Sequence, residues 1–464
     1  MKLTWFHSYN FTILFRVFLA LTSWGYIHPD EYHQSLEIFH GSTRSWEWQQ
    51  NNALRSKFIT ELLSKSLLES NVLLGNRIWL LLVVSLSTDL CVGQFIFEFY
   101  YSRRYRLMTL FSLCWPTLVF SYRPFSNNLE TNLLSMFTLV FLRSHWCLPK
   151  WIYSSVFAGI LCACGVFNRF TFVFFAAPSV LAIFFRDSTL TINQIGLRMA
   201  FFSAAFIFLG LSIIFDDSKF FGKFTIAPLN NFLYNMKTDN VAEHGLHPRV
   251  THVLVNFPML FLPLLLNLKL APTTPTTPTA TALKWTVILP LICLSLSPHQ
   301  EPRFILPLLT PLFLLAAEKL SKCGTPMTIF FVIFNLVLTF FFGVAHQGGV
   351  IPSLTWLSSK ENYQAVYWRT YMVPTFVATN VSDFSGESEH HLFGRLRELK
   401  CEQKIENLYL VAPASVPLPP NLSLDNDCTI EARFFHLSTE DLAKSFDELH
   451  LNVYSIISSS FCLA

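Results

Sequence analysis

The chain has 464 residues, of which 52% are hydrophobic, 16% aromatic and only 14% charged. Soluble domains carry roughly 25% charged residues, so this composition and a mean hydropathy of +0.42 exclude an ordinary soluble protein and indicate a polytopic membrane protein. The formal net charge of +3 is too small to indicate a nucleic-acid partner.

In chain order, apolar spans alternate with short loops. The first apolar run follows Lys2 and lacks a small-residue cleavage site, so it is predicted to be an uncleaved helix rather than a signal peptide. A membrane-spanning helix needs about 20 apolar residues. On this basis about eleven spans are predicted, at roughly 9–27, 71–97, 107–122, 128–142, 151–165, 170–185, 199–215, 251–268, 284–297, 303–317 and 326–345.

The remaining segments are polar. Residues 28–70 and 216–250 are long loops, and residues 271–282 (APTTPTTPTATA) are a Pro/Thr-rich linker. We therefore expect a multi-span membrane domain over 1–345 and a separate C-terminal region over 346–464. The fold class predicted is all-α and polytopic, followed by a small α/β region. In that region the pattern predicts strands at 408–411 and 451–457 and a helix start at 438–441.

Basic residues are concentrated in alternate loops. By the positive-inside rule this asymmetry places the N-terminus in the cytosol and the C-terminal region in the lumen. The sequons at Asn380 and Asn421 would then be glycosylation acceptors, whereas the sequon at Asn10 would be cytosolic and unused. Cys401 and Cys428 could pair in such an oxidising compartment.

The tetrapeptide His28-Pro29-Asp30-Glu31 directly follows the first span. Two carboxylates at a span end are costly if buried and unpaired, but one of them can act as a general base towards a sugar hydroxyl. The alternative is a solvated loop or a helix N-terminus that favours negative charge. Asp30 and Glu31 are the candidate catalytic residues.

The other predicted lumenal loops carry Arg, His, Asn, Gln and Glu. Arg and His donate hydrogen bonds that fit a phosphate, and the amides suit sugar hydroxyls, although a lone interfacial Arg is usually a membrane anchor. The histidines are dispersed, so neither a metal site nor a cofactor is predicted. The candidate donor- and acceptor-binding residues are His28, Arg123, Asn127, Glu130, Arg169, His247, Arg249, His299, Gln300, Glu301, Arg303, His346 and Gln347.

Five motifs in order resemble the lumenal motifs of the dolichyl-phosphate-mannose-dependent mannosyltransferases of glycosyltransferase family 22, which are GT-C enzymes. They are HPDEYHQSLE, RPFSNNLET, HGLHPRVTHVLVNFP, SPHQEPRFILPLL and HQGGVIP. The combination of the third and fifth motifs looks most like the GPI mannosyltransferases that act fourth in anchor assembly. The resemblance covers roughly residues 10–355, and the Pro/Thr insert departs from it.

The resemblance implies a multi-pass enzyme of the endoplasmic reticulum membrane. It would move mannose from dolichyl phosphate mannose to a lipid-linked GPI glycan, with inversion, and make the α-1,2 bond of the fourth mannose. It also favours Asp30 over Glu31 as the base. Three alternatives stay open: another GPI or N-glycan mannosyltransferase, a multi-pass transporter, and a structural subunit without catalysis. A transporter would place ionisable groups near the membrane midplane.

Overall fold

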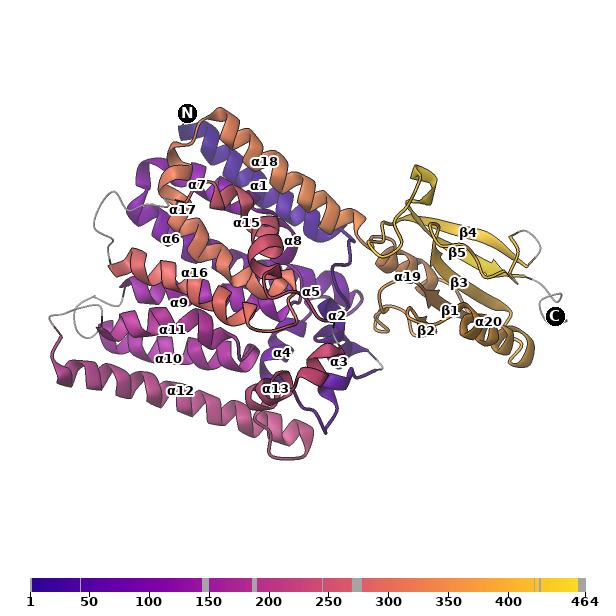
Figure 1. Cartoon of the computed structure of the whole chain (residues 1–464), viewed down its shortest axis with the longest axis horizontal. Coiled ribbons are helices and arrows are strands. Elements are labelled where there is room, and N and C mark those ends of the chain that lie inside the picture. Colours follow the sequence, from indigo (N-terminus) through magenta and orange to yellow (C-terminus); the bar gives the residue numbers. More distant parts are fainter. Residues whose placement is uncertain are drawn as a thin grey trace. The chain divides into compact units, whose positions relative to one another are not determined.

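The computed structural model describes residues 2–41, 43–143, 150–185, 190–243, 245–268, 278–420, 422–424 and 427–457. The chain forms two compact units, Met1–Ala20 with Trp46–Leu336 and Leu21–Ser45 with Val337–Ala464. The first unit is built of helices (Figure 1). The second combines short helices with a five-stranded sheet.

The first unit is mostly helical because its long apolar segments suit a membrane. A membrane offers no water to the backbone, and a helix pairs its backbone N–H and C=O groups within the same segment. Helix α1 begins in the first unit, and α18 ends in the second. The helices are α1 (Lys2–Thr22), α4 (Lys57–Ser64), α5 (Val72–Leu80), α6 (Leu86–Phe99), α7 (Arg104–Leu113), α8 (Trp115–Phe120), α9 (Ser126–Arg143), α10 (Lys150–Asn168), α11 (Phe172–Phe185), α12 (Ile192–Phe221), α13 (Ala227–Asn235), α14 (Thr238–Ala242), α15 (Phe257–Leu265), α16 (Pro278–Ser295), α17 (Leu309–Lys322) and α18 (Thr325–Phe340).

Within the described residues, five helical stretches are long and apolar enough to cross a membrane: Val72–Phe99, Trp151–Asn168, Ile192–Phe221, Pro302–Lys322 and Thr325–Ala345. Three shorter apolar helices are Phe172–Phe185, His252–Leu265 and Ala280–Ser295. Each of these stretches coincides with a predicted span, so the protein is a membrane protein with several apolar helices. The predicted total of about eleven spans is not confirmed.

The predicted single span at 107–122 is wrong in detail, because two helices occupy it. Helix α7 ends at Leu113 and α8 begins at Trp115. Pro116 has no backbone N–H and cannot continue the preceding helix. The backbone N–H of Trp115 instead donates to the side-chain oxygen of Asn335, at 2.7 Å.

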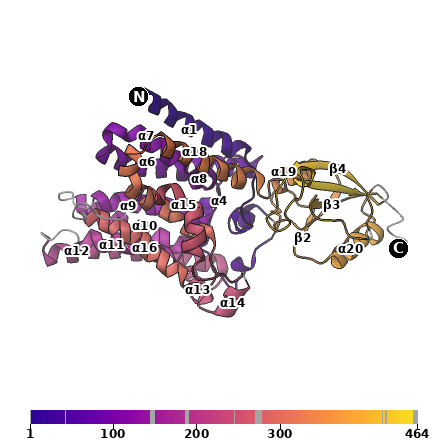
Figure 2. The same cartoon turned by 45° about the horizontal axis from the view of Figure 1, so that its top comes forward.

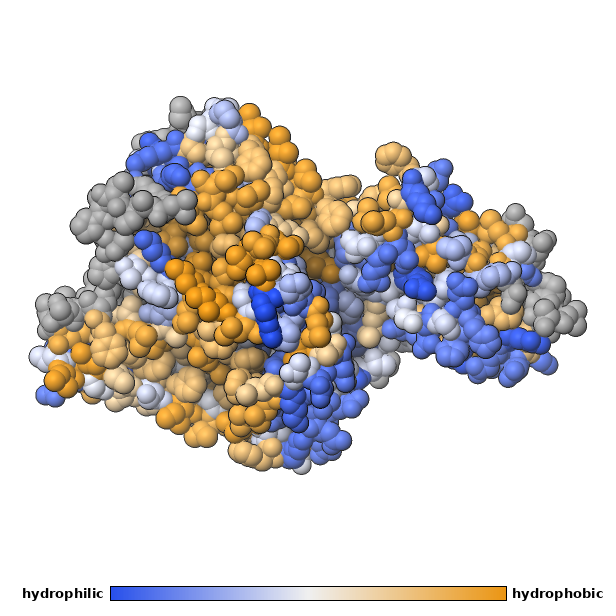
Figure 3. All heavy atoms as spheres, viewed as in Figure 1, coloured by the Kyte–Doolittle hydropathy of each residue, from blue (hydrophilic) through white to orange (hydrophobic). Residues whose placement is uncertain are grey.

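Helix α12 is the longest helix described, with 30 residues, or about 45 Å. A capping box between Thr191 and Gln194 starts it, and Gly222 at a φ of 68° ends it. Only 17% of its most apolar window is buried, so much of its apolar surface faces outward, as lipid contact requires. Figure 3 shows apolar side chains over this helix and its neighbours. Helices α10 and α12 run side by side (Figure 2).

A buried ion pair inside the helical unit was not predicted. Arg16 of α1 donates to the carboxylate of Asp89 in α6, and the two side chains are 2% and 5% exposed. Arg16 also donates to the hydroxyl of Ser85, at 2.8 Å. Because the two opposite charges meet, the pair holds helices together and neutralises an otherwise costly carboxylate in an apolar span.

The second unit contains a mixed sheet in the order β2-β1-β3-β5-β4, in which β1 runs parallel to β2 and β3, and β5 runs antiparallel to β3 and β4. Both predicted strands are present, as β3 and β5. The elements are α2 (Asp30–His33), α3 (Leu36–His40), α19 (Val350–Ser358), β1 (Tyr363–Trp368), β2 (Val381–Phe384), α20 (Glu389–Arg397), β3 (Asn407–Pro413), β4 (Cys428–Phe435) and β5 (His450–Ile456).

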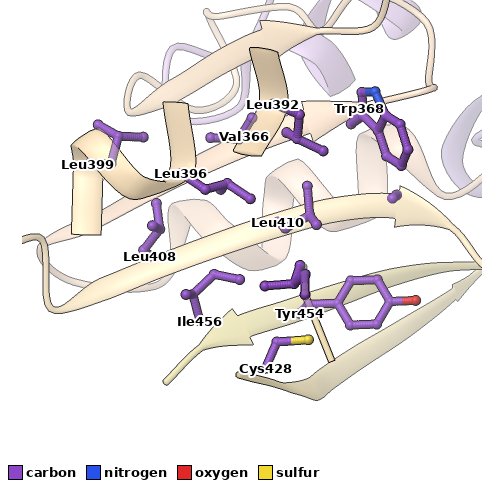
Figure 4. Packing of buried hydrophobic residues seen from close by; sticks show 12 residues of the cluster. Val366, Trp368, Leu392, Leu396, Leu399, Leu408, Leu410, Cys428, Tyr454 and Ile456 are labelled. Carbon is purple, nitrogen blue, oxygen red and sulfur yellow. The ribbon is translucent and has the colours of Figure 1, made fainter. Parts of the chain in front are cut away.

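One face of α20 packs into the hydrophobic core of the sheet region. Leu392 and Leu396, one helical turn apart, pack with Leu408 and Leu410 of β3 (Figure 4). The alternation of inward and outward side chains along β4, which has a bulge between Ile430 and Ala432, matches a strand with one exposed face.

In the C-terminal region the structure excludes one possibility that the sequence left open and contradicts one prediction. Cys401 is in a disulfide, but Cys428 is a buried thiol whose Sγ lies 3.7 Å from the carbonyl oxygen of Ser423, so these two cysteines do not pair. No helix starts at 438–441. Ser438 accepts from the N–H groups of Glu440 and Asp441, as a helix cap would, but Leu437 is held by the carbonyl of Ala345. Residues 271–277 and Asn421 lie outside the described residues.

Candidate active site

Three candidate residues of the first unit, Arg169, His299 and Arg303, gather around one aromatic ring, that of Phe304. Phe304 lies in the helical turn η5 (Pro302–Leu308). The guanidinium carbons of Arg169 and Arg303 lie 5.1 and 5.7 Å from the centroid of this ring. The ring of His299 lies 5.5 Å away, edge to face. Residues predicted from separate motifs therefore meet, since Arg169 comes from the α10–α11 connection.

Glu301 joins two of these cations. His299 Nε2 lies 2.7 Å from one carboxylate oxygen of Glu301, and Arg303 Nε donates to the other. His299 Nδ1 lies 3.1 Å from the carbonyl oxygen of Gly245. Both ring nitrogens therefore face acceptors, which is the pattern of an imidazolium cation. Burial lowers the pKa of His299, but the hydrogen bond and charge of Glu301 outweigh burial, so the pKa lies above its ordinary value.

Glu130 holds the third cation. Its side chain is fully buried in the first turns of α9, and Oε2 lies 3.5 Å from Arg169 Nε. Thr171 donates to the other carboxylate oxygen, at 3.0 Å, and Arg169 also donates to Ser126, at 3.2 Å. Burial lowers the pKa of Arg169 to about 10, against the charge of Glu130, so Arg169 stays cationic at neutral pH.

This cation cluster is defined by Arg169, His299 and Arg303 with Glu130 and Glu301. Among the described residues of this cluster, three positive charges face two carboxylates, so the cations outnumber the carboxylates by one. Such a site favours an anion, and Arg and imidazolium donors fit phosphate oxygens. In the described part of the chain no group of three His, Cys, Asp or Glu side chains is placed to hold a metal ion.

Arg123 and Asn127 lie beside the cluster, at the start of α9. Both side chains are fully buried. Arg123 Nε donates to the carbonyl of Val119, at 2.9 Å, and its guanidinium lies 5.6 Å from the ring of Tyr122. Phe125, in the same connection, lies 5.7 Å from the guanidinium of Arg303.

Three further candidates tie two loops together. Gln300 donates to the carbonyls of Arg249, Ser295 and Ser297 at 3.0–3.1 Å. Its amide oxygen accepts from the backbone N–H of His252, at 2.7 Å. His247 donates its backbone N–H to Pro298, and Arg249 donates to the carbonyl of Leu296. These contacts favour a positioning role for Gln300, because both polar atoms of its side-chain amide already have protein partners.

Asp30 and Glu31 belong to the second unit, in the single turn α2. Pro29 precedes the turn with a φ of −52°, as its ring requires. The side chain of Asp30 is 27% exposed, and its Oδ2 accepts from Gln34 Nε2, at 2.6 Å. His28 Nδ1 accepts from the backbone N–H of Asp30, at 3.1 Å. Glu31 is fully buried, so Asp30 is the more accessible of the two carboxylates.

The C-terminal part of the chain holds the segment that carries Asp30. Gly25 and Tyr26 donate their backbone N–H groups to the carbonyls of Gly343 and His346, both at 2.8 Å. The Tyr26 hydroxyl donates to the carbonyl of Met372, at 2.9 Å. A side chain at Gly25 would collide with the carbonyl of Phe342, so only glycine permits this approach.

His346 and Gln347, predicted as binding residues, are part of this attachment. His346 Nδ1 lies 2.9 Å from the carbonyl oxygen of Tyr26. Gln347 donates its backbone N–H to Leu437 and accepts from the backbone of Tyr371. Both side chains are buried, which favours a structural role over direct sugar contact.

Glu37 was not singled out from the sequence, although it lies in the HPDEYHQSLE motif. Its carboxylate is 1% exposed and accepts from Thr375 and Phe376, whose backbone N–H groups lie 2.9 and 3.3 Å away. Glu37 is the third carboxylate of this motif and lies seven positions after Asp30. Its place in the motif was the signal that could have identified it.

Residues 7–377, most of the chain, match the Alg9-like mannosyltransferase family. The chain belongs to the Alg9-like mannosyltransferase family. As a member it is a glycosyltransferase that transfers mannose. The motifs from HPDEYHQSLE to HQGGVIP all lie within the matched residues.

Three relatives are 29–32% identical to this chain over their matched residues. GPI mannosyltransferase 4 of Candida albicans is 30% identical over 80% of both chains. The protein of the same name from Schizosaccharomyces pombe is 29% identical over 84% of this chain and 79% of its own. That from Eremothecium gossypii is 32% identical over 78% and 76%.

The fold also resembles a solved structure. ArnT from Cupriavidus metallidurans, in its apo state and bound to undecaprenyl phosphate, superposes with TM-scores of 0.56 and 0.60. The apo structure covers 97% of this chain at 12% identity, and the bound structure 99% at 10%. At this identity the likeness shows the shared GT-C fold alone.

Proposed function

We propose that this mannosyltransferase adds the fourth, α-1,2-linked mannose to the GPI-anchor precursor, with dolichyl phosphate mannose as donor. The relatives named GPI mannosyltransferase 4 support the choice of acceptor. The single structural observation that carries the donor is the cation cluster around Phe304, which has one positive charge in excess. The solved relative of the same fold with a bound polyprenyl phosphate supports a lipid phosphate as ligand.

In the proposed reaction Asp30 accepts the proton of the attacking mannose hydroxyl. The hydroxyl oxygen forms the new bond to the anomeric carbon, and the bond to the phosphate oxygen breaks with inversion. The phosphate departs as a dianion, so it needs cationic stabilisation rather than a general acid. Arg303, Arg169 and His299 supply positive charge at the leaving group, and Glu31 orients Asp30 or the acceptor.

The decisive test is complementation. The chain is expressed in cells that lack the fourth GPI mannosyltransferase, and their GPI precursors are analysed by mass spectrometry. We expect precursors with four mannoses to return with the wild-type chain. Extension of an N-glycan precursor, or of an earlier GPI intermediate in cells lacking another mannosyltransferase, would contradict this assignment.

The proposed location is the endoplasmic reticulum membrane, with the N-terminus cytosolic and the second unit lumenal. Asn380 is exposed and directly precedes β2, and the disulfide at Cys401 suits an oxidising compartment.

We expect Asn380 to carry a glycan and Asn10, which is exposed in α1, to carry none. Endoglycosidase treatment should increase the gel mobility of the wild-type protein. Asn380→Gln should remove one glycan, and Asn10→Gln is the matched control that should change nothing. A mobility change caused by Asn10→Gln would reverse the proposed orientation.

A further inference from the structure

His252 lies beside Phe304, the ring around which the cation cluster gathers, and was not among the predicted site residues. It begins the π-helical turn η4 (His252–Asn256), and its side chain is fully buried. Its ring lies 6.4 Å from that of Phe304, the ring around which Arg169, Arg303 and His299 gather. The backbone N–H of His252 donates to Gln300, which fixes the start of the turn. π-Helical turns of this kind are frequent at functional sites.

The partner of one ring nitrogen determines what the other can do. Asn256 Nδ2 lies 3.1 Å from His252 Nδ1. An amide nitrogen can only donate, so Nδ1 must be the acceptor and must carry no proton. The ring proton is therefore on Nε2. Nε2 is fully buried and has no hydrogen-bond partner among the residues that the structure describes.

A buried N–H without an acceptor is costly, by about 1–3 kcal/mol, and calls for an acceptor from a ligand. The Phe304 ring that His252 neighbours is also flanked by the cations Arg169, Arg303 and His299, which attract an oxyanion. We propose that His252 Nε2–H binds a non-bridging phosphate oxygen of the dolichyl phosphate mannose donor, with Asn256 as the positioning residue that sets its tautomer. This inference rests on the proposed function and adds a binding residue to it.

Side-chain length offers a direct test. The amide nitrogen of Gln reaches the position of His Nε2, whereas that of Asn reaches only the position of Nδ1. With the purified full-length enzyme, we expect His252→Asn and His252→Leu to raise the KM for dolichyl phosphate mannose and the Ki of dolichyl phosphate about 10- to 100-fold. We expect His252→Gln to retain most of the affinity. Thermal unfolding of each variant checks that it is folded.

Asn256 provides a second, independent test. In Asn256→Asp the carboxylate can only accept, so the ring proton moves to Nδ1 and Nε2 becomes an acceptor that repels phosphate. Asn256→Ala leaves both tautomers accessible. We expect the Ki of dolichyl phosphate to rise more in Asn256→Asp than in Asn256→Ala. Equal rises in the two variants would indicate a packing role only and would overturn the assignment of the tautomer.

Other outcomes separate this inference from the proposed function. A wild-type enzyme that does not use dolichyl phosphate mannose would contradict the proposed function. An active wild type with equal constants for folded His252→Gln and His252→Asn variants would overturn the inference alone. A raised KM for the donor with an unchanged Ki of dolichyl phosphate would place His252 at the sugar and overturn the phosphate contact.

Discussion

Asp30→Asn is expected to lower kcat by about 10²- to 10⁴-fold while the protein still folds and reaches the membrane. The change removes the proposed proton acceptor but preserves the size of the side chain. Asn can still receive the hydrogen bond from Gln34, which in the wild type is 2.6 Å long. The measurement is mannose transfer to a GPI acceptor by the purified enzyme, with saturating donor.

Two variants serve as comparisons for Asp30→Asn. Asp447→Asn removes an exposed carboxylate from the turn η8 (Phe446–Glu448) and is expected to leave turnover unchanged. Gln34→Leu removes only the hydrogen bond to Asp30. Since such a hydrogen bond contributes about 1 kcal/mol, this variant is expected to lower kcat less than 10-fold. Normal turnover in Asp30→Asn would remove this carboxylate from the mechanism, and normal turnover in Glu31→Gln as well would remove the whole motif.

Arg303→Ala is expected to lower kcat/KM about 100-fold or more. The Arg303 side chain is 6% exposed and its guanidinium donates to Glu301, so Arg303→Ala deletes the proposed leaving-group contact and also leaves the half-buried carboxylate of Glu301 with one partner fewer. Arg303→Lys should rescue poorly, because an ammonium group cannot reproduce the planar pair of donors. Steady-state kinetics with varied dolichyl phosphate mannose would measure the loss.

Arg249→Ala provides the comparison for Arg303→Ala. Both arginines lie in motifs that the sequence made equal candidates. In the structure Arg249 is exposed and donates to the carbonyl of Leu296, whereas Arg303 belongs to the cation cluster. We therefore expect a smaller effect from Arg249→Ala. The phosphate site is misplaced if Arg303→Ala retains wild-type kinetics.

Hydropathy and motif order predicted much of the fold, and the residues proposed for the site stay a prediction. Span positions followed from runs of apolar residues, because a membrane allows few alternatives to a helix. The strands β3 and β5 followed from short buried runs between turns. The break between α7 and α8 was missed because the prediction counted only apolar residues. Such a count treats Pro116 as apolar and ignores that it lacks the backbone N–H needed to continue a helix.

Partner choice inside the site could not be predicted, because it depends on contacts between distant segments. A glutamine in a polar motif looks the same whether it faces a sugar or three backbone carbonyls, as Gln300 does. The false helix start at Ser438 has a similar cause. Its local capping pattern is present, but the adjacent Leu437 pairs with the loop at Ala345, more than ninety positions earlier. A sequence pattern indicates local conformational preference, whereas the structure at Gln300 and Ser438 is determined by tertiary contacts.

The attachment of residues 21–45 to the end of the chain has a consequence for biogenesis. The Asp30 loop is among the first segments to leave the ribosome, but Met372, Thr375 and Phe376, which hold Tyr26 and Glu37, are made more than three hundred residues later. Loop order must therefore wait until the C-terminal part of the chain has been made and has folded. A nascent or truncated chain would hold the proposed phosphate-binding arginines without an ordered Asp30 loop, so we expect activity only after the second unit has folded.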